Sequence, residues 1–185
     1  GAIQAWENIP RIQGASAGSY QKLAEIYQLR GLYEEAIAAL QRAQRLPGGN
    51  PYELMTQMIA LRVEMGDDEA LLREYLNASI MQLGYEYHFR GLIVEQVANP
   101  ERGDRLFAIL QRKIGEYGEE RKKDLLRRLG VEILIALNRS SQAVDFVQST
   151  YATHPDRGRQ LYQLGSDLQS KGAIESAVKA FSLTP

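Results

Sequence analysis

The chain has 185 residues, of which 44% are hydrophobic and 24% charged, a composition typical of one soluble globular domain. Its formal net charge of −1 gives no electrostatic basis for binding nucleic acid or an anionic membrane, and no apolar stretch is long enough to cross a bilayer. The chain has no cysteine, which excludes disulfides, thiolate metal sites and a cysteine nucleophile but leaves open a cytoplasmic or a bacterial periplasmic location.

Apolar residues recur at helical spacing through almost the whole chain, and turn-forming residues divide it into short helices. The densest set of helix breakers is 46–50, after which Pro51 stands at the position that proline favours, the first of a helix. Asp67 is suited to cap the next helix, and Asn99-Pro100 ends another. In chain order, helices are predicted over about 17–30, 33–46, 51–65, 68–81, 85–98, 101–117, 119–137 and 141–153, with a final pair after the loop at 154–156.

An alanine stands near the start of every second predicted helix. These alanines recur at steps of 34 to 38 residues, the period of solenoids built from helix–turn–helix repeats. The longest step, from Ala70 to Ala108, is four residues longer than the shortest (38 against 34), which makes the region 80–103 the irregular part of the array. The six alanines are Ala2, Ala36, Ala70, Ala108, Ala143 and Ala177.

Two stretches carry a fuller motif. The first joins Tyr20-x2-Leu23-Ala24-x2-Tyr27 to Gly31, Ala36-x3-Leu40 and Pro47, and the last joins Leu161-x2-Leu164-Gly165-x2-Leu168 to Gly172 and Ala177-x3-Phe181. In each, a small residue stands where two helices cross closely, and glycine falls at the turn, where a positive φ is expected. Asn138 holds that turn position in the fourth repeat and tolerates the same conformation. Both stretches resemble the tetratricopeptide repeat, whose pattern is W-x2-L-G-x2-Y, then A-x3-F, then P.

The resemblance implies an all-α fold, a right-handed α-solenoid of antiparallel helix pairs that is a segment of a longer array. It implies about five repeats after a leading half-repeat, all within one superhelical domain over 1–185. In the half-repeat Trp6 takes the large apolar position, where it forms either an interaction surface or, as we favour, an end left by cutting a longer array. The expected divisions are 1–16 for the half-repeat, then 17–50, 51–84, 85–118, 119–157 and 158–185.

The resemblance also implies that the first helix of each repeat lines a concave face, the usual binding surface of a solenoid. That groove would be polar near its start, apolar in the second repeat and arginine-bearing toward the end, which suits an extended peptide or a partner helix with an acidic end. In the alternative, Met55 and Ile59 are buried against a neighbouring repeat. Glu25 lies where chaperone-binding members begin a clamp for a C-terminal carboxylate, and its charge argues against that ligand. The predicted groove residues are Gln21, Glu25, Gln28, Tyr52, Met55, Ile59, Arg62, Arg128, Glu132, Arg159 and Tyr162, with Ile135 and Ser166 on the same faces.

A second candidate patch lies at 85–90, the most aromatic stretch of the chain, and consists of Tyr85, Tyr87, His88, Phe89 and Arg90. One interpretation is a peptide-binding surface on which Arg90 holds a carboxylate. The interpretation we favour is that Tyr85 and Phe89, four positions apart, belong to the core.

Charged residues at 121–128 form the one basic cluster of the sequence, and neighbouring acidic residues largely neutralise it. We therefore expect a solvated, salt-bridged helix face there and no nucleic-acid site. His88 and His154 lack convergent ligand-type neighbours, so no metal site is predicted, and His154 is expected to be solvated. The sequence has no phosphate-binding loop or nucleophile motif, and accordingly no catalytic residue, cofactor or enzymatic activity is predicted.

The leading functional hypothesis is a scaffold that holds a protein or peptide partner in its concave groove, without contact to nucleic acid and without direct membrane insertion. The alternative is a structural spacer, or a segment that self-associates through the array ends. Either would belong to a larger, bacterial protein, and the family resemblance includes periplasmic scaffolds of envelope assembly or polysaccharide export. The sequence does not identify the partner.

Overall fold

The computed structural model describes residues 14–184, so the predicted half-repeat with Ala2 and Trp6 lies outside the described residues. Within 14–184 all the regular structure is helical. The chain divides into two compact units, with unit 1 ending at Ile93 and unit 2 beginning at Val94. The single continuous superhelix stays a prediction.

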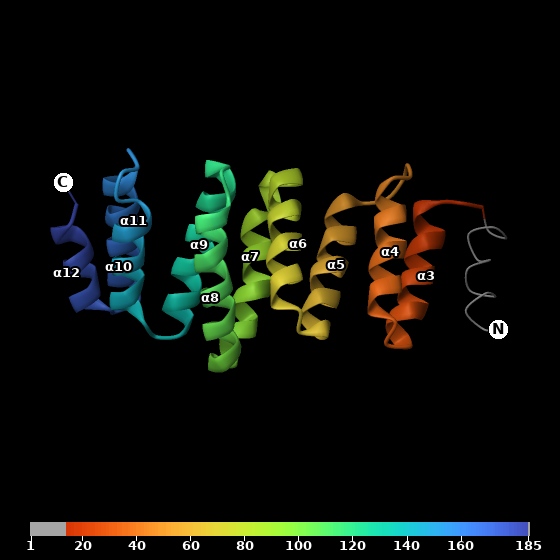
Figure 1. The fold of residues 1–185 in the computed structure, drawn as a ribbon, viewed down its shortest axis with the longest axis horizontal. Coiled ribbons are helices and arrows are strands. Elements are labelled where there is room, and N and C mark those ends of the chain that lie inside the picture. The colour runs from red at the N-terminus through yellow and green to blue at the C-terminus, as the bar shows by residue number, and fades with distance from the viewer. Residues whose placement is uncertain (1–13, 185) are drawn as a thin grey trace. The chain divides into compact units, whose positions relative to one another are not determined.

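Unit 1 is a row of helices in which each packs on the next, α3 on α4, α4 on α5 and α5 on α6 (Figure 1). After α6 a short 3-10 helix, η1, leads into α7. The bounds are α3 Ala17–Leu29, α4 Tyr33–Gln44, α5 Pro51–Met65, α6 Asp68–Met81, η1 Leu83–Tyr85 and α7 Glu86–Val94.

Unit 2 repeats this sequential packing, with α8 on α9, α9 on α10, and α10 on both α11 and α12, which also pack on each other. A 3-10 helix, η2, precedes α8 and packs against it. The bounds are η2 Glu95–Ala98, α8 Pro100–Glu116, α9 Glu120–Ala136, α10 Ser140–Thr150, α11 Arg157–Ser170 and α12 Ile174–Ser182.

Local signals in the sequence set most helix boundaries. Pro51 occupies the first turn of α5, and the Asp67 carboxylate accepts a hydrogen bond of 3.0 Å from the Ala70 N–H at the start of α6. The predicted turns are confirmed, because Gly31 and Gly172 have φ of 71° and 78°, and Asn138 has φ of 60° between α9 and α10. In that conformation an ordinary side chain is strained, which explains the choice of glycine and asparagine.

The prediction of one continuous helix over 85–98 was wrong. It is split into η1, α7 and η2, and α7 has only 9 residues. Phe89, Ile93 and Val97 are nevertheless buried along it. Periodicity finds such a buried stripe but does not distinguish α-helix from short 3-10 turns, because the two differ by less than one residue per turn.

The predicted role of Ala108 was also wrong, since Ala108 is exposed on α8. The small buried residue of this helix is Gly103, on which an added Cβ would lie 3.0 Å from side-chain atoms of Leu137 and Val97. Measured from Gly103 the steps become 33 residues back to Ala70 and 40 on to Ala143. The extra length therefore lies after 103, in α8 and α9, which have 17 residues each.

The structure confirms an all-α chain of sequentially packed helices, consistent with a helical repeat. A small buried residue lies early in each second helix: Ala36, Ala70, Gly103, Ala143 and Ala177. Among the described residues, no helix is both long enough and apolar enough to cross a membrane.

Candidate partner-binding surfaces

The predicted groove residues of α3 lie at the surface of unit 1. Glu25 and Gln28 are exposed, and Gln21 is half-buried. The Gln28 side-chain amide donates a hydrogen bond of 3.0 Å to Glu64 at the end of α5. This helix therefore presents polar groups to solvent, as predicted.

The apolar middle of the predicted groove is absent. Met55 and Ile59 on α5 are 1% and 0% exposed, because α5 is packed between α4 and α6. Their prediction as groove residues was wrong, and the alternative of burial against a neighbouring helix is confirmed. Helical spacing places them on one face of α5, but only the packing of the neighbours decides whether that face is open.

Arg62, on the same helix, joins two helices. Its guanidinium donates a hydrogen bond of 2.7 Å to Glu34 on α4, and its side chain is only 12% exposed. It also lies 3.6 Å from the Met65 sulfur. Arg62 is consequently engaged in holding α5 to α4, and its binding surface is reduced.

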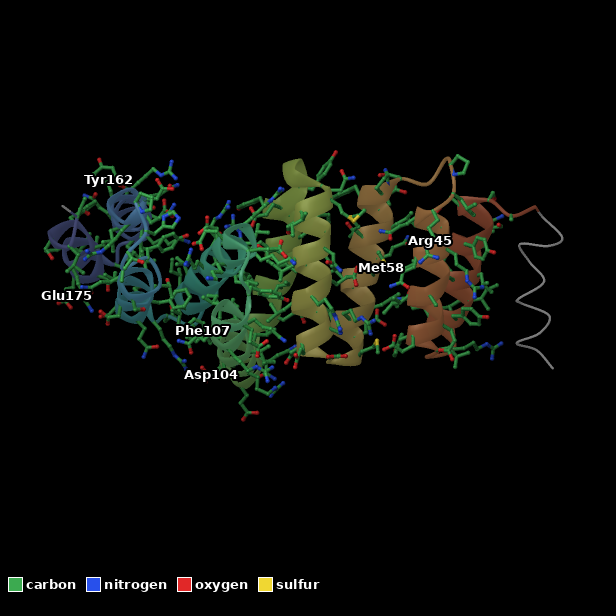
Figure 2. The ribbon with its side chains drawn as sticks, turned by 45° about the horizontal axis from the view of Figure 1, so that its top comes forward. Arg45, Met58, Asp104, Phe107, Tyr162 and Glu175 are labelled. Atoms are coloured by element: carbon green, nitrogen blue, oxygen red, sulfur yellow. The ribbon has the colours of Figure 1, made fainter. Side chains whose placement is uncertain are left out.

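Unit 2 displays larger exposed side chains on its first helices, α9 and α11. Arg128 is exposed on α9, where Glu132 and Ile135 are half-buried. On α11, Arg159 has a side chain that is 69% exposed and that pairs with Asp156 at 2.7 Å. Tyr162 is 61% exposed and projects from α11 (Figure 2). Two arginines and a tyrosine are thus the exposed members of the predicted groove in unit 2.

The aromatic patch at 85–90 is divided between core and surface. Phe89 is fully buried, as favoured, whereas Tyr85 and Tyr87 are 46% and 76% exposed, so the core interpretation of Tyr85 was wrong. The Arg90 guanidinium lies 5.5 Å from the centre of the Tyr87 ring and 3.6 Å from the Glu86 carboxylate. Arg90 is therefore already engaged by its own helix.

Tyr52, predicted as a groove residue of α5, joins this aromatic patch. Its ring centre lies 4.3 Å from that of Tyr85, 5.2 Å from that of His88 and 6.0 Å from that of Phe89. Residues 52 and 85 come from different helices, so no local pattern in the sequence signals the contact. The cluster holds the start of α5 against η1 and α7.

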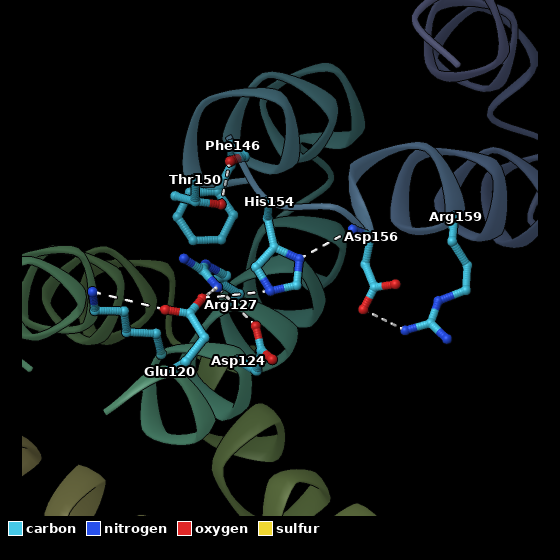
Figure 3. Close-up of polar contacts among 9 residues, drawn as sticks. Glu120, Asp124, Arg127, Phe146, Thr150, His154, Asp156 and Arg159 are labelled. Carbon is cyan, nitrogen blue, oxygen red and sulfur yellow. Dashed lines mark hydrogen bonds and ion pairs between the residues drawn. The ribbon is translucent and has the colours of Figure 1, made fainter. Parts of the chain in front are cut away.

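The basic cluster of α9 is salt-bridged as predicted, but its central residue is not solvated. Arg127 is only 7% exposed and donates hydrogen bonds of 2.5 Å to Glu120 and 2.7 Å to Asp124 (Figure 3). Its guanidinium carbon lies 4.5 Å from the centre of the Tyr151 ring, at the end of α10. This cation–π contact and the ion pairs fix α9 against α10.

His154 completes this cluster, so its prediction as a solvated residue was wrong. Its side chain is 19% exposed, and Nε2 lies 3.7 Å from the Glu120 carboxylate. Nδ1 accepts a hydrogen bond of 3.2 Å from the Asp156 N–H (Figure 3). The imidazole ring also meets the Tyr151 ring edge-on, with 5.3 Å between the ring centres. The loop at 151–156 folds back on α9, and that return is a tertiary contact without a local sequence signal.

Three potential metal ligands meet in this cluster, since oxygen atoms of Glu120 and Asp124 and a nitrogen of His154 lie within 4.8 Å of one another. The Arg127 guanidinium, however, donates to both carboxylates. A metal ion would have to displace this buried cation and leave it without its acceptors. The arrangement is that of a structural ion-pair network, in which Arg127 already binds both carboxylates.

Alkaline titration provides a test of this cluster. Burial, together with the Asp124 carboxylate beside it, raises the pKa of Tyr151 to about 12. In the unfolded chain the Tyr151 phenol has its ordinary pKa of about 10. The contribution of the neutral phenol to the free energy of unfolding is therefore complete below pH 10, and it is lost as the pH rises toward about 12. We expect Tyr151 to contribute to a late step in an ultraviolet titration of the tyrosines, and Tyr151→Phe to reduce that step by one tyrosine. Loss of the late step in Tyr162→Phe instead would contradict this placement.

Comparison of the sequence with protein-family models and with curated proteins finds no match. The tetratricopeptide resemblance therefore rests on the sequence motifs alone, and the packing is consistent with a helical repeat.

Proposed function

We propose that this chain is a tetratricopeptide-like helical scaffold that binds a segment of another protein on the faces of its first helices. The observation that carries the proposal is the small buried residue repeated at the third or fourth position of α4, α6, α8, α10 and α12. Such repetition is typical of helical-repeat scaffolds, which bind their partners on helix faces and not in a pocket. The proposal includes no enzymatic activity.

The exposed residues of unit 2 support a partner with acidic and apolar groups. Arg128 and Arg159 offer cations on α9 and α11, and Tyr162 offers an aromatic ring that can stack or donate a hydrogen bond. Arginine and tyrosine are the residues that most often dominate protein interfaces. An extended or helical peptide with an acidic end fits this combination better than a partner that offers only a C-terminal carboxylate.

The test is capture of a partner by the purified chain from lysate of the source organism. The double variant Arg128→Glu, Arg159→Glu is expected to lower capture at least about tenfold, because two attractive charges become repulsive. The control Arg45→Glu, Arg73→Glu makes the same charge change on two exposed residues away from the first helices, one directly after α4 and one on α6. It should capture as well as the native chain. Equal capture by both variants would exclude these faces as the binding surface.

The alternative, a spacer or self-associating segment, is supported by two apolar residues of α12, Ile174 and Val178, which are 54% and 61% exposed. Under both alternatives the proposed role is non-catalytic, and its proposed location is the cytoplasm or the periplasm of a bacterium, where envelope-assembly and polysaccharide-export scaffolds act.

A further inference from the structure

Arg157, the first residue of α11, is a half-buried cation without an anionic partner among residues 14–184. Its Nε atom is buried, and its guanidinium makes no hydrogen bond or ion pair within that range. The other buried or half-buried lysines and arginines of the same range each pair with a carboxylate or a side-chain amide oxygen. Arg62 and Arg127 also have a buried Nε, but both are paired through Nη1. Because a cation shielded from water is costly unless an acceptor satisfies it, Arg157 is suited to bind an anion.

The acidic groups around the start of α11 are already paired with other cations (Figure 3). The Asp156 carboxylate, next to Arg157 in the chain, accepts a hydrogen bond of 2.7 Å from Arg159. Glu120, on α9, accepts a hydrogen bond from Arg127. The first turn of α11 contains no acidic residue that could take their place. An anion for Arg157 must therefore come from another molecule.

We infer that Arg157 binds an acidic side chain, aspartate or glutamate, of the partner segment; this inference rests on the scaffold function proposed above. A guanidinium can donate from Nε and Nη to both oxygens of one carboxylate, a geometry that an ammonium group does not offer. Arg128 and Arg159 are exposed, so water screens their attraction for an acidic partner. Arg157 is more shielded, and its ion pair with a carboxylate is accordingly the stronger contact.

Urea unfolding of the full chain tests whether Arg157 is unpaired in the free protein. Arg157→Met should leave the midpoint unchanged or raise it, because it removes an unsatisfied cation and keeps a long apolar side chain. Arg127→Met, which breaks two ion pairs, should lower the midpoint. If Arg157→Met lowers it as far as Arg127→Met does, Arg157 has a partner within the chain and the inference is overturned.

Nuclear magnetic resonance of the arginine Nε–H groups in the isotope-labelled full chain tests the ligand. The probe is blocked tetraglutamate, and blocked tetraglutamine is its neutral control. The Arg157 signal, identified by its absence in Arg157→Gln, should shift and saturate with a dissociation constant on the order of 1 mM. Arg73→Gln, which changes an exposed arginine of α6, should leave that titration unchanged. An Arg157 signal that does not saturate, or that responds more strongly to inorganic phosphate than to tetraglutamate, would overturn the assignment of a carboxylate.

Capture from lysate separates this inference from the proposed function. Arg157→Gln should lower capture of the partner at least about tenfold, because the partner's carboxylate loses its shielded cation. If Arg128→Glu, Arg159→Glu lowers capture but Arg157→Gln does not, the inference fails and the proposed function stands. If no variant changes capture while tetraglutamate still saturates Arg157, the proposed function fails and the carboxylate site stands.

Discussion

Replacing Arg127 with methionine is expected to lower the free energy of unfolding of unit 2 by about 2 kcal/mol. The substitution keeps a long apolar side chain but removes both ion pairs and the contact with the Tyr151 ring. Loss of one partner from a fully buried ion pair commonly costs about 3–5 kcal/mol. The lower value applies here because the side chains of Glu120 and Asp124 are 47% and 29% exposed and regain water.

Urea unfolding of the full chain, with hydrogen exchange to follow α9 and α10, measures this effect. Arg128→Met is the matched control on the same helix. Arg128 is exposed, so water screens its interactions, and its loss should change stability by less than about 1 kcal/mol. Equal effects of the two substitutions would show that the cluster does not stabilise unit 2.

The effect of Arg127→Met should also depend on pH. Hydrogen bonding from Arg127 lowers the pKa of Glu120, so the stabilisation by this pair is complete above the ordinary glutamate pKa and is lost as the pH falls through the lowered value. The stability difference between native and variant chains should therefore shrink in acid.

The second large effect is expected at Gly130, where substitution by alanine should lower stability by about 2 kcal/mol. An added Cβ would lie 2.7 and 2.9 Å from ring carbons of Phe146 and 3.1 Å from Leu110. Phe146 cannot retreat, because it is 5% exposed and its ring packs at 5.2 Å against Phe107. The overpacking outweighs the roughly 1 kcal/mol that alanine gains over glycine in a helix.

Gly165 provides the matched comparison. Its added Cβ would lie 2.7 Å from the Phe181 ring, almost the same clash, yet Phe181 is half-buried and can rotate toward solvent. We expect Gly165→Ala to lower stability by less than about 1 kcal/mol, measured by the same urea titration. If Gly165→Ala proves as damaging as Gly130→Ala, the mobility of the neighbouring ring does not decide the result.

The structure corrected the assignment of the small residue in α8 for a simple reason. Ala108 fits a period near 34 residues, but α8 and α9 are longer than their counterparts, and the crossing with its neighbours falls at Gly103. A sequence period counts residues, whereas close approach depends on where two helix axes cross. The sequence predicted that a small residue lies early in each second helix. It did not predict that this residue is Gly103 in α8.

For the candidate surfaces too, the sequence predicted which residues share a helix face, but not whether that face is covered. The positions of Met55 and Ile59 on one helix face followed from spacing, but their burial depends on α4 and α6 lying on both sides of α5. The Tyr52–Tyr85 contact and the Arg127–Tyr151 contact each join different elements, and so neither could be expected from local pattern.

The sequence by itself determined most of the helices, the turns at Gly31, Asn138 and Gly172, and the small residues of every second helix except α8. These depend on the conformational preferences of single residues and on apolar periodicity, which act over a few positions. Tertiary structure alone decided which apolar residues are covered, why Arg127 is buried with His154 beside it, and why Val178 remains open. Burial depends on the neighbours that a helix face meets, and residues distant in sequence supply those neighbours.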